Sequence, residues 1–289
     1  MKNTIIILSA FSLLVILSCK DVDKKTMNEG EAQTLLNEAA IAYSIYAGTQ
    51  EEATRAGLQV EDFLSKSAQA PNAVYPQISI DPSGLTFPKT ITLDYGPDNL
   101  NGVDGHQRRG IIIIEADNFP DVEGAIWDIT FSDYYQDDNK VEGSQTIKYL
   151  GKNANDHPEY QSFVTDGMIT TPNNKVFYFE QETTREWIAG YDTHYLLTGN
   201  LTDLCDDKYE ITGSHWGTSS DGYSYSMSSG EPLIVGVCCQ WVEDGVLNVS
   251  LDDYDLSCEI DYKPAGDDGG CNNQASFSIF GANIPINLP

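Results

Sequence analysis

The stretch Ile126-Trp127-Asp128-Ile129-Thr130-Phe131 carries the pattern that decides the fold. Apolar and polar side chains alternate along it, and a period of two residues is that of a strand with one face in a core. Thr90-Ile91-Thr92-Leu93-Asp94-Tyr95 alternates in the same way. Both stretches therefore predict β-strands that bury one face, as strands of an antiparallel sheet do.

Further short strands are expected from Ala73 onward, at intervals of roughly 8 to 15 residues and separated by polar turns. Parallel strands would need helices between them, and the sequence shows no helical period there. We therefore predict a mainly β, antiparallel, β-sandwich-like domain over residues 71–289. Two stretches resemble each other, Asp94-Tyr95-Gly96-Pro97 and Asp261-Tyr262-Lys263-Pro264, so two related halves, 71–182 and 183–289, are one interpretation.

Within this β region, Glu243-Asp244-Gly245 predicts a tight hairpin loop. Separate strands are expected on its two sides, at Pro232–Trp241 and Val246–Leu251. Another strand is expected before them at Tyr223–Met227.

Residues 29–70 are the segment with a helical period. Gly48 predicts the end of a first helix, and Ala70-Pro71 the end of a second. The two starting points are predicted by capping pairs, Asn28 with Glu31 and Thr49 with Glu52. We therefore expect a short helical segment in front of the β domain, with apolar stripes that pack against it.

The start of the chain predicts an export signal. A lysine at position 2 precedes an apolar run, Ile5 to Leu17, which is too short to span a membrane. Ser18 and Cys19 close the run, and the segment resembles the lipobox of bacterial lipoproteins. This resemblance implies a signal peptide over residues 1–18, a lipid on Cys19, and a charged tether over residues 19–28; a plain secretory signal is the alternative.

Charge limits the partners of the chain. It carries 44 acidic and 16 basic residues, for a net charge of −28. Nucleic acid requires a basic face, so we expect no nucleic-acid partner. Anionic lipid is disfavoured for the same reason, and the expected contact with the membrane is through the lipid on Cys19.

Five cysteines follow Cys19, and the predicted export signal implies a compartment in which disulfides form. An odd number leaves at least one thiol unpaired within the chain. Cys238 and Cys239 are adjacent in an expected strand, so their side chains should serve different partners. The sequence contains no Cys-x-x-Cys pair, which disfavours a zinc site.

Several stretches together resemble a family of uncharacterised Bacteroidota lipoproteins. This resemblance implies location in the outer membrane, exposure at the cell surface and β content, but no catalytic activity. It also implies a disulfide between Cys271 and either Cys238 or Cys239, of which we favour Cys239. Tyr75 and Leu100 stand where the family typically has another cysteine pair. The matching stretches are Thr90–Gly96, Asp104-Gly105, Arg108-Arg109-Gly110, Thr130–Tyr135, Val141-Glu142-Gly143, Arg185-Glu186-Trp187, Gly190, Tyr209–Gly213, Gly217 and Gly270–Asn273.

One loop is rich in oxygen ligands and suggests a candidate Ca²⁺ site formed by Asp98, Asn101 and Asp104. The competing interpretation is that Asp, Asn and Gly simply make turns, and under it no cofactor is expected. Catalytic motifs such as Gly-x-Ser-x-Gly are absent from the sequence. A carbohydrate-active hydrolase that uses two carboxylates remains the alternative function.

Aromatic side chains in turn-rich segments favour ligand binding instead. Trp187, Trp216 and Tyr223 are the candidate residues of an aromatic platform for a glycan or a protein. Packing in a core is the alternative role for each of them. We therefore expect a lipid-anchored surface protein that acts as a non-catalytic binding or structural module.

Overall fold

The computed structural model describes residues 29–65, 76–84, 86–102, 105–193, 205–239, 241–251, 254, 256–267, 269–279 and 282–287. They form one helix and one continuous antiparallel sheet, so the predicted mainly β, antiparallel fold is confirmed. The elements are α1 (Glu29–Ser65), β1 (Gln77–Asp81), β2 (Lys89–Asp94), β3 (Leu100–Asn101), β4 (Gln107–Ala116), β5 (Ile126–Gln136), β6 (Asn139–Lys152), β7 (Pro158–Thr170), β8 (Val176–Ala189), β9 (Lys208–Thr218), β10 (Ser224–Gly236), β11 (Val242–Leu251), β12 (Leu256–Asp261), β13 (Gln274–Ile279) and β14 (Ala282–Asn287).

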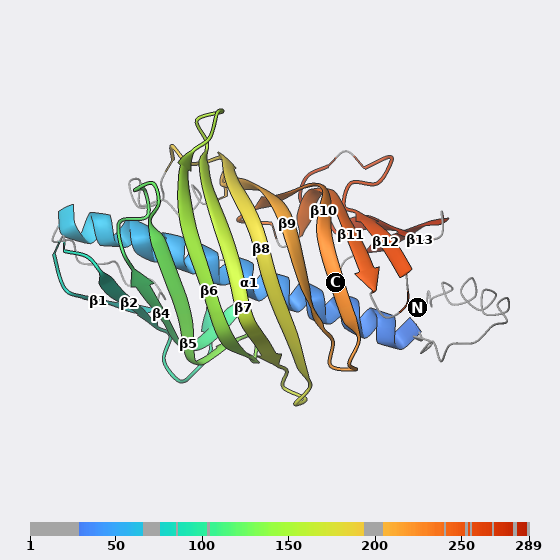
Figure 1. Cartoon of the computed structure of the whole chain (residues 1–289), viewed down its shortest axis with the longest axis horizontal. Coiled ribbons are helices and arrows are strands. Elements are labelled where there is room, and N and C mark those ends of the chain that lie inside the picture. The colour runs from blue at the N-terminus through green and yellow to red at the C-terminus, as the bar shows by residue number, and fades with distance from the viewer. Residues whose placement is uncertain are drawn as a thin grey trace, which may run out of the picture.

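The sheet and the helix make two layers. The strands pair in chain order from β1 to β14, except that the short β3 pairs only with β4. Figure 1 shows α1 running behind the sheet and crossing its strands at a steep angle. The inner face of the sheet packs against α1, and the opposite face is the outer face.

The core consists of two clusters that share α1. The first joins Tyr46 and neighbouring residues of α1 to strands β2 to β8, and Tyr46 stacks on Phe179 with ring centroids 5.5 Å apart. The second joins Leu35 and Ala39 to strands from β8 to β13. The suggested boundary between two halves, at residues 182 and 183, falls inside β8, so both segments belong to one sheet.

The prediction of two helices is wrong, because α1 continues through Gly48 as a single helix of 37 residues. Thr49 does not cap a second helix. Its fully buried hydroxyl lies 2.9 Å from the carbonyl oxygen of Tyr46, in the preceding turn, and also contacts the side chain of Gln145 on β6. A β-carbon at Gly48 would lie 3.1 Å from the guanidinium of Arg108, so glycine here permits a close approach of helix and sheet.

Acidic side chains of α1 bind the sheet. The Glu38 carboxylate accepts a hydrogen bond of 2.7 Å from the backbone N–H of Ser220 and another from its hydroxyl. Glu51 pairs with the buried guanidinium of Arg185. Buried charges are tolerated when they are paired, so these contacts fix the position of α1 along the sheet.

The predicted hairpin at Glu243-Asp244-Gly245 is also wrong, because these residues lie within β11. Gly245 has a φ of +110° where β10 passes very close: a β-carbon there would lie 2.2 Å from the carbonyl oxygen of Pro232. Gly245 therefore permits an irregular, closely packed point in the strand and does not form a turn. The two strands expected at Tyr223–Met227 and Pro232–Trp241 are largely one strand, β10, with register shifts along it.

The predicted signal peptide, Cys19 and the tether lie outside the described residues. Among the residues that the structure does describe, no helix combines the length and apolar character needed to cross a membrane.

Candidate functional site

Strand register places five residues in one row across the outer face of the sheet. Even-numbered residues of β8, β9 and β10 point outward near this row, while the odd-numbered side chains of Phe179, His215 and Tyr225 are buried. Each member pairs with the next across adjacent strands, and we call the set the Trp216 row: Glu180, Trp216, Ser226, Ser250 and Ser257.

A groove of about 610 Å³ follows this row. Short hydroxyl side chains from four strands leave the space open, because each is much smaller than the aromatic residues beside it. We call it the serine groove after six serines that line it: Ser214, Ser224, Ser226, Ser228, Ser250 and Ser257. Thr218 and Asn248 add further polar side chains to its lining.

Two exposed aromatic side chains stand in this groove. Trp216 is 39% exposed and Tyr178 is 52% exposed, although both are large and largely apolar. Tyr178 pairs with Thr218 and Trp216 pairs with Glu180, so the two aromatic residues are diagonal neighbours on one face of β8 and β9. Exposed aromatic residues that gather at a groove are typical of binding surfaces.

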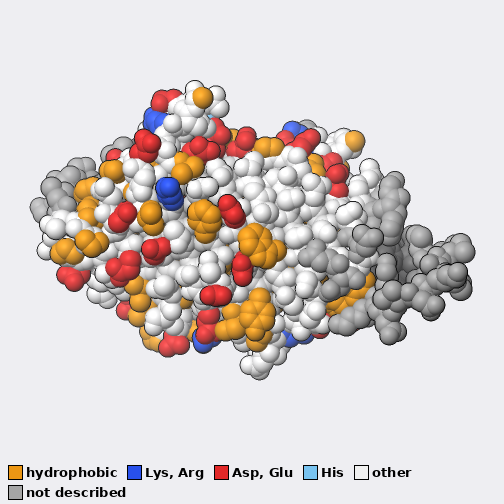
Figure 2. All heavy atoms as spheres, viewed as in Figure 1, with side chains coloured by type: hydrophobic (Ala, Val, Ile, Leu, Met, Phe, Trp, Pro, Cys, Tyr) orange, Lys and Arg blue, Asp and Glu red, His pale blue; other side chains and the backbone are white. Residues whose placement is uncertain are grey.

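The charge of the groove is negative. Glu180 is the one carboxylate among the described lining residues, and none of them is Lys, Arg or His. The next row of paired residues begins and ends in carboxylates: Glu182, Ser214, Ser228, Asn248 and Glu259. Figure 2, which has the same view as Figure 1, shows scattered acidic and hydrophobic side chains on a surface with few Lys or Arg residues.

The structure keeps only one member of the predicted aromatic platform on the surface. Trp187 is buried and stacks on Tyr209 with ring centroids 5.5 Å apart. Tyr223 is also buried and contacts Tyr254. The three candidates therefore do not form one platform, and Trp216 is joined instead by Tyr178.

Tyr178 and Glu180 are the site residues that the sequence reasoning missed. Their signal was the alternation along β8, where Val176 to Trp187 changes face at every residue. The sequence does not reveal which of the two faces is covered by α1. Trp187 lies on the covered face and is buried, whereas Trp216 lies on the other face and is exposed.

A histidine on the inner face of the sheet, behind the groove, packs in the core and does not line the groove. His215 precedes Trp216 in β9 and lies between the rings of Tyr43 and Phe179, each with a centroid 5.6 Å away. Burial lowers the pKa of His215 to about 4, so the ring is neutral at physiological pH. Its Nε2 atom lies 3.2 Å from the sulfur of Met227.

A buried carboxyl group, that of Asp207, lies directly before the first residue of β9. Asp207 lies near the Glu51–Arg185 ion pair, and Asp207 is buried. Burial, and then the negative charges of Glu51 and Asp206, raise the pKa of Asp207 to about 7. Asp207 therefore holds a proton more readily than an ordinary aspartate does.

The predicted Ca²⁺ loop is held together by its own hydrogen bonds. The Asn101 side-chain oxygen accepts a hydrogen bond of 3.1 Å from the side-chain amide of Gln107. Asp98 is described but Asp104 lies outside the described residues. Within the described ranges, no three His, Cys, Asp or Glu side chains gather closely enough to hold a metal ion.

The structure contains two disulfides at one end of the C-terminal strands. Cys239 bonds to Cys271, the pair implied by the family resemblance, and Cys238 bonds to Cys205. The adjacent cysteines thus serve different partners, although they lie in the turn after β10 and not in a strand. Cys258 is the free cysteine among the described residues, and burial raises its pKa to about 11.

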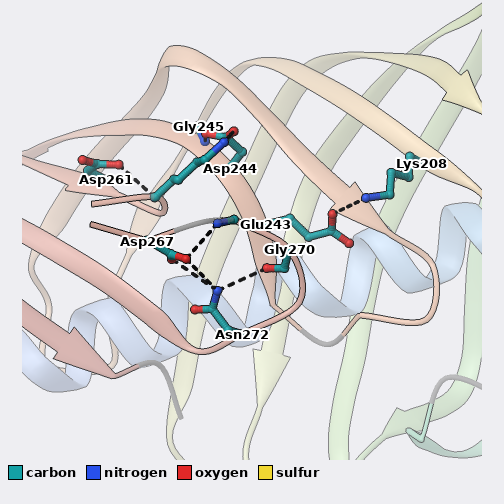
Figure 3. A network of polar contacts seen from close by, with 10 residues as sticks. Lys208, Glu243, Asp244, Gly245, Asp261, Asp267, Gly270 and Asn272 are labelled. Carbon is teal, nitrogen blue, oxygen red and sulfur yellow. Dashed lines mark hydrogen bonds and ion pairs between the residues drawn. The ribbon is translucent and has the colours of Figure 1, made fainter. Parts of the chain in front are cut away.

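A polar network beside the Cys239–Cys271 bond fixes the neighbouring loops (Figure 3). The Lys263 ammonium lies 2.8 Å from the Asp244 carboxylate, and the Asp267 carboxylate accepts a hydrogen bond of 2.9 Å from the Gly269 N–H. The Asn272 side chain also donates to Asp267 at 3.2 Å. These contacts join loop to strand, so we assign this end a structural role.

Fold and groove together define a class of protein: an antiparallel sheet backed by one long helix, with a polar and aromatic groove on its outer face. A scan against protein-family models finds no match, and searches of curated proteins and of solved structures find none either.

Proposed function

We propose that this protein is a lipid-anchored envelope protein of the bacterial outer membrane, exposed at the cell surface, whose sheet acts as a non-catalytic binding module. The serine groove is the binding site. The observation that carries this proposal is the exposure of Trp216 and Tyr178 beside a groove lined with hydroxyl groups.

The membrane anchor is the lipid on Cys19, as the lipobox implies. One acyl chain holds a protein only marginally, whereas two or more hold it firmly. Cys19→Ala should therefore release the full-length protein from membranes in cell fractionation, with Cys258→Ala as the matched control that stays bound. Membrane association of Cys19→Ala would contradict the anchor.

Binding fits the groove better than hydrolysis does. A hydrolase of the two-carboxylate type needs a second carboxyl group about 5 to 9.5 Å from the first. Glu180 is the one carboxylate among the described residues that line the groove, and Glu182 follows it on the same face of β8. The two stand side by side at the β8 end of the groove, whereas the acids of a glycosidase flank the scissile bond. The acid with a strongly raised pKa, Asp207, is buried near Arg185 and is not part of the lining.

A binding array tests this function. Full-length protein purified in detergent is screened against immobilised glycans and envelope proteins, next to Trp216→Ala and Ile126→Ala. Ile126 is the matched control, because it is 37% exposed on the same outer face but lies on β5, away from the groove. We expect a signal that Trp216→Ala abolishes and Ile126→Ala retains; equal signals from both variants would overturn the site.

A further inference from the structure

We infer that the ligand is an uncharged, linear oligosaccharide that lies across the strands, with one sugar ring against Trp216. This inference rests on the proposed binding function and adds the chemical class and direction of the ligand. Four observations support it: the direction of the groove, its hydroxyl groups, its aromatic residues and its charge.

The Trp216 row gives the direction. Its five members lie on β8, β9, β10, β11 and β12, so the row runs perpendicular to the strands. Adjacent strands are about 4.8 Å apart, which makes the row roughly 19 Å long. The groove therefore suits an elongated ligand that contacts several strands in succession.

The lining suits a ligand that is covered with hydroxyl groups. A serine hydroxyl both donates and accepts hydrogen bonds, as does a sugar hydroxyl, so either partner can adapt to the other. Trp216 and Tyr178 offer flat apolar surfaces, and the faces of a pyranose ring that carry C–H groups pack against such surfaces. Hydroxyl side chains next to exposed aromatic rings thus match both surfaces of a sugar.

The charge of the groove selects an uncharged sugar. Glu180 in the groove, with Glu182 and Glu259 at the ends of the next row, repels uronic acids, sulfates and phosphates. None of the described lining residues could pair with such anions, because none is basic. A basic peptide would also suit a negative groove, but its binding would weaken as salt screens the charges.

The experiment is affinity electrophoresis of full-length protein in gels that contain soluble neutral glucans, mannans or xylans, or uronic-acid polymers. We expect retardation in at least one neutral polymer and none in the uronic-acid polymers. Trp216→Ala should weaken this binding about tenfold or more, as expected when a central aromatic anchor is truncated. Ser226→Tyr should abolish it by filling the groove, whereas Thr130→Tyr on the outer face of β5 should not.

The dependence of binding on ionic strength distinguishes a sugar ligand from a basic peptide ligand. Binding of an uncharged glycan should stay the same between low and high salt, since screening acts on charged pairs. Loss of binding at high salt, retardation by uronic-acid polymers alone, or no retardation by any neutral polymer would overturn this inference. If the array still shows binding of a protein that depends on Trp216, the proposed binding function survives; if no binding depends on Trp216, both fail.

Discussion

At the scale of single residues, Asp207 and His215 respond to pH in opposite directions. The pKa of Asp207 is raised to about 7, so the folded chain holds a proton there that the unfolded chain has lost. The pKa of His215 is lowered to about 4, so the folded chain lacks a proton that the unfolded chain binds. As pH rises from about 4 to about 6.5, Asp207 therefore lowers the free energy of unfolding while His215 increases it.

The variant Asp207→Asn removes the contribution of Asp207 to the pH dependence and leaves that of His215. The amide has nothing to ionise, so the variant should be more stable than the wild type at pH 8. The difference between a pKa of about 7 and the ordinary aspartate pKa of about 3.9 is worth about 4 kcal/mol in full. Screening by solvent reduces the expected gain to on the order of 2 kcal/mol. The gain should shrink as the pH falls below 7 and vanish near pH 4, where Asp207 is protonated in the folded wild type. Urea denaturation across this pH range measures it.

The control for this prediction is Asp98→Asn, because Asp98 is exposed and lies between β2 and β3, several strands away from Asp207. Its effect on the free energy of unfolding should be small at every pH. Stability curves of Asp207→Asn and wild type that run parallel from pH 4 to pH 8 would contradict the raised pKa.

At the scale of elements, the strands could be predicted because their alternation is local. Ile126–Phe131 and Thr90–Tyr95 lie in β5 and in β2 with its adjoining turn, as their two-residue period indicated. The unbroken helix could not be predicted, because Gly48 is a helix terminator by local rules. Its place in the middle of α1 depends on Arg108, which is distant in the sequence and near in space.

The candidate site was predictable only in part. Trp216 was named from composition and local context, and it is exposed. The same reasoning named Trp187 and Tyr223, which are buried, because sequence alone does not say which face of a strand meets the helix. The pairing of Trp216 with Ser226 and of Ser226 with Ser250 required the register of three strands.

The Cys239–Cys271 disulfide stabilises the end of the C-terminal strands. It joins residues separated by 32 positions, and closing a loop of this size stabilises a fold by about 3 to 4 kcal/mol in the chain-entropy model. The double variant Cys239→Ala, Cys271→Ala should therefore unfold at lower urea concentration. Cys258→Ala, which removes a free thiol, should change the midpoint little, and equal midpoints for both variants would contradict this role.

At the scale of the whole molecule, α1 leaves the outer face of the sheet uncovered. The helix contributes to both core clusters, so it occupies the inner face along most of the sheet. The predicted tether before it, residues 19–28, spans at most about 35 Å when fully extended. Under the proposed function, a module held this way would stay near the membrane with its outer face turned to a ligand.

The central claim is that Trp216 is covered when the protein binds its ligand, and quenching of tryptophan fluorescence by acrylamide measures this directly. Trp127 and Trp187 are buried and Trp241 is half-buried, whereas Trp216 is 39% exposed, so Trp216 should supply much of the quenchable signal in the free protein. A neutral oligosaccharide that binds should reduce quenching in the wild type and leave quenching of Trp216→Phe unchanged. Undiminished quenching of the wild type at saturating ligand would contradict the claim.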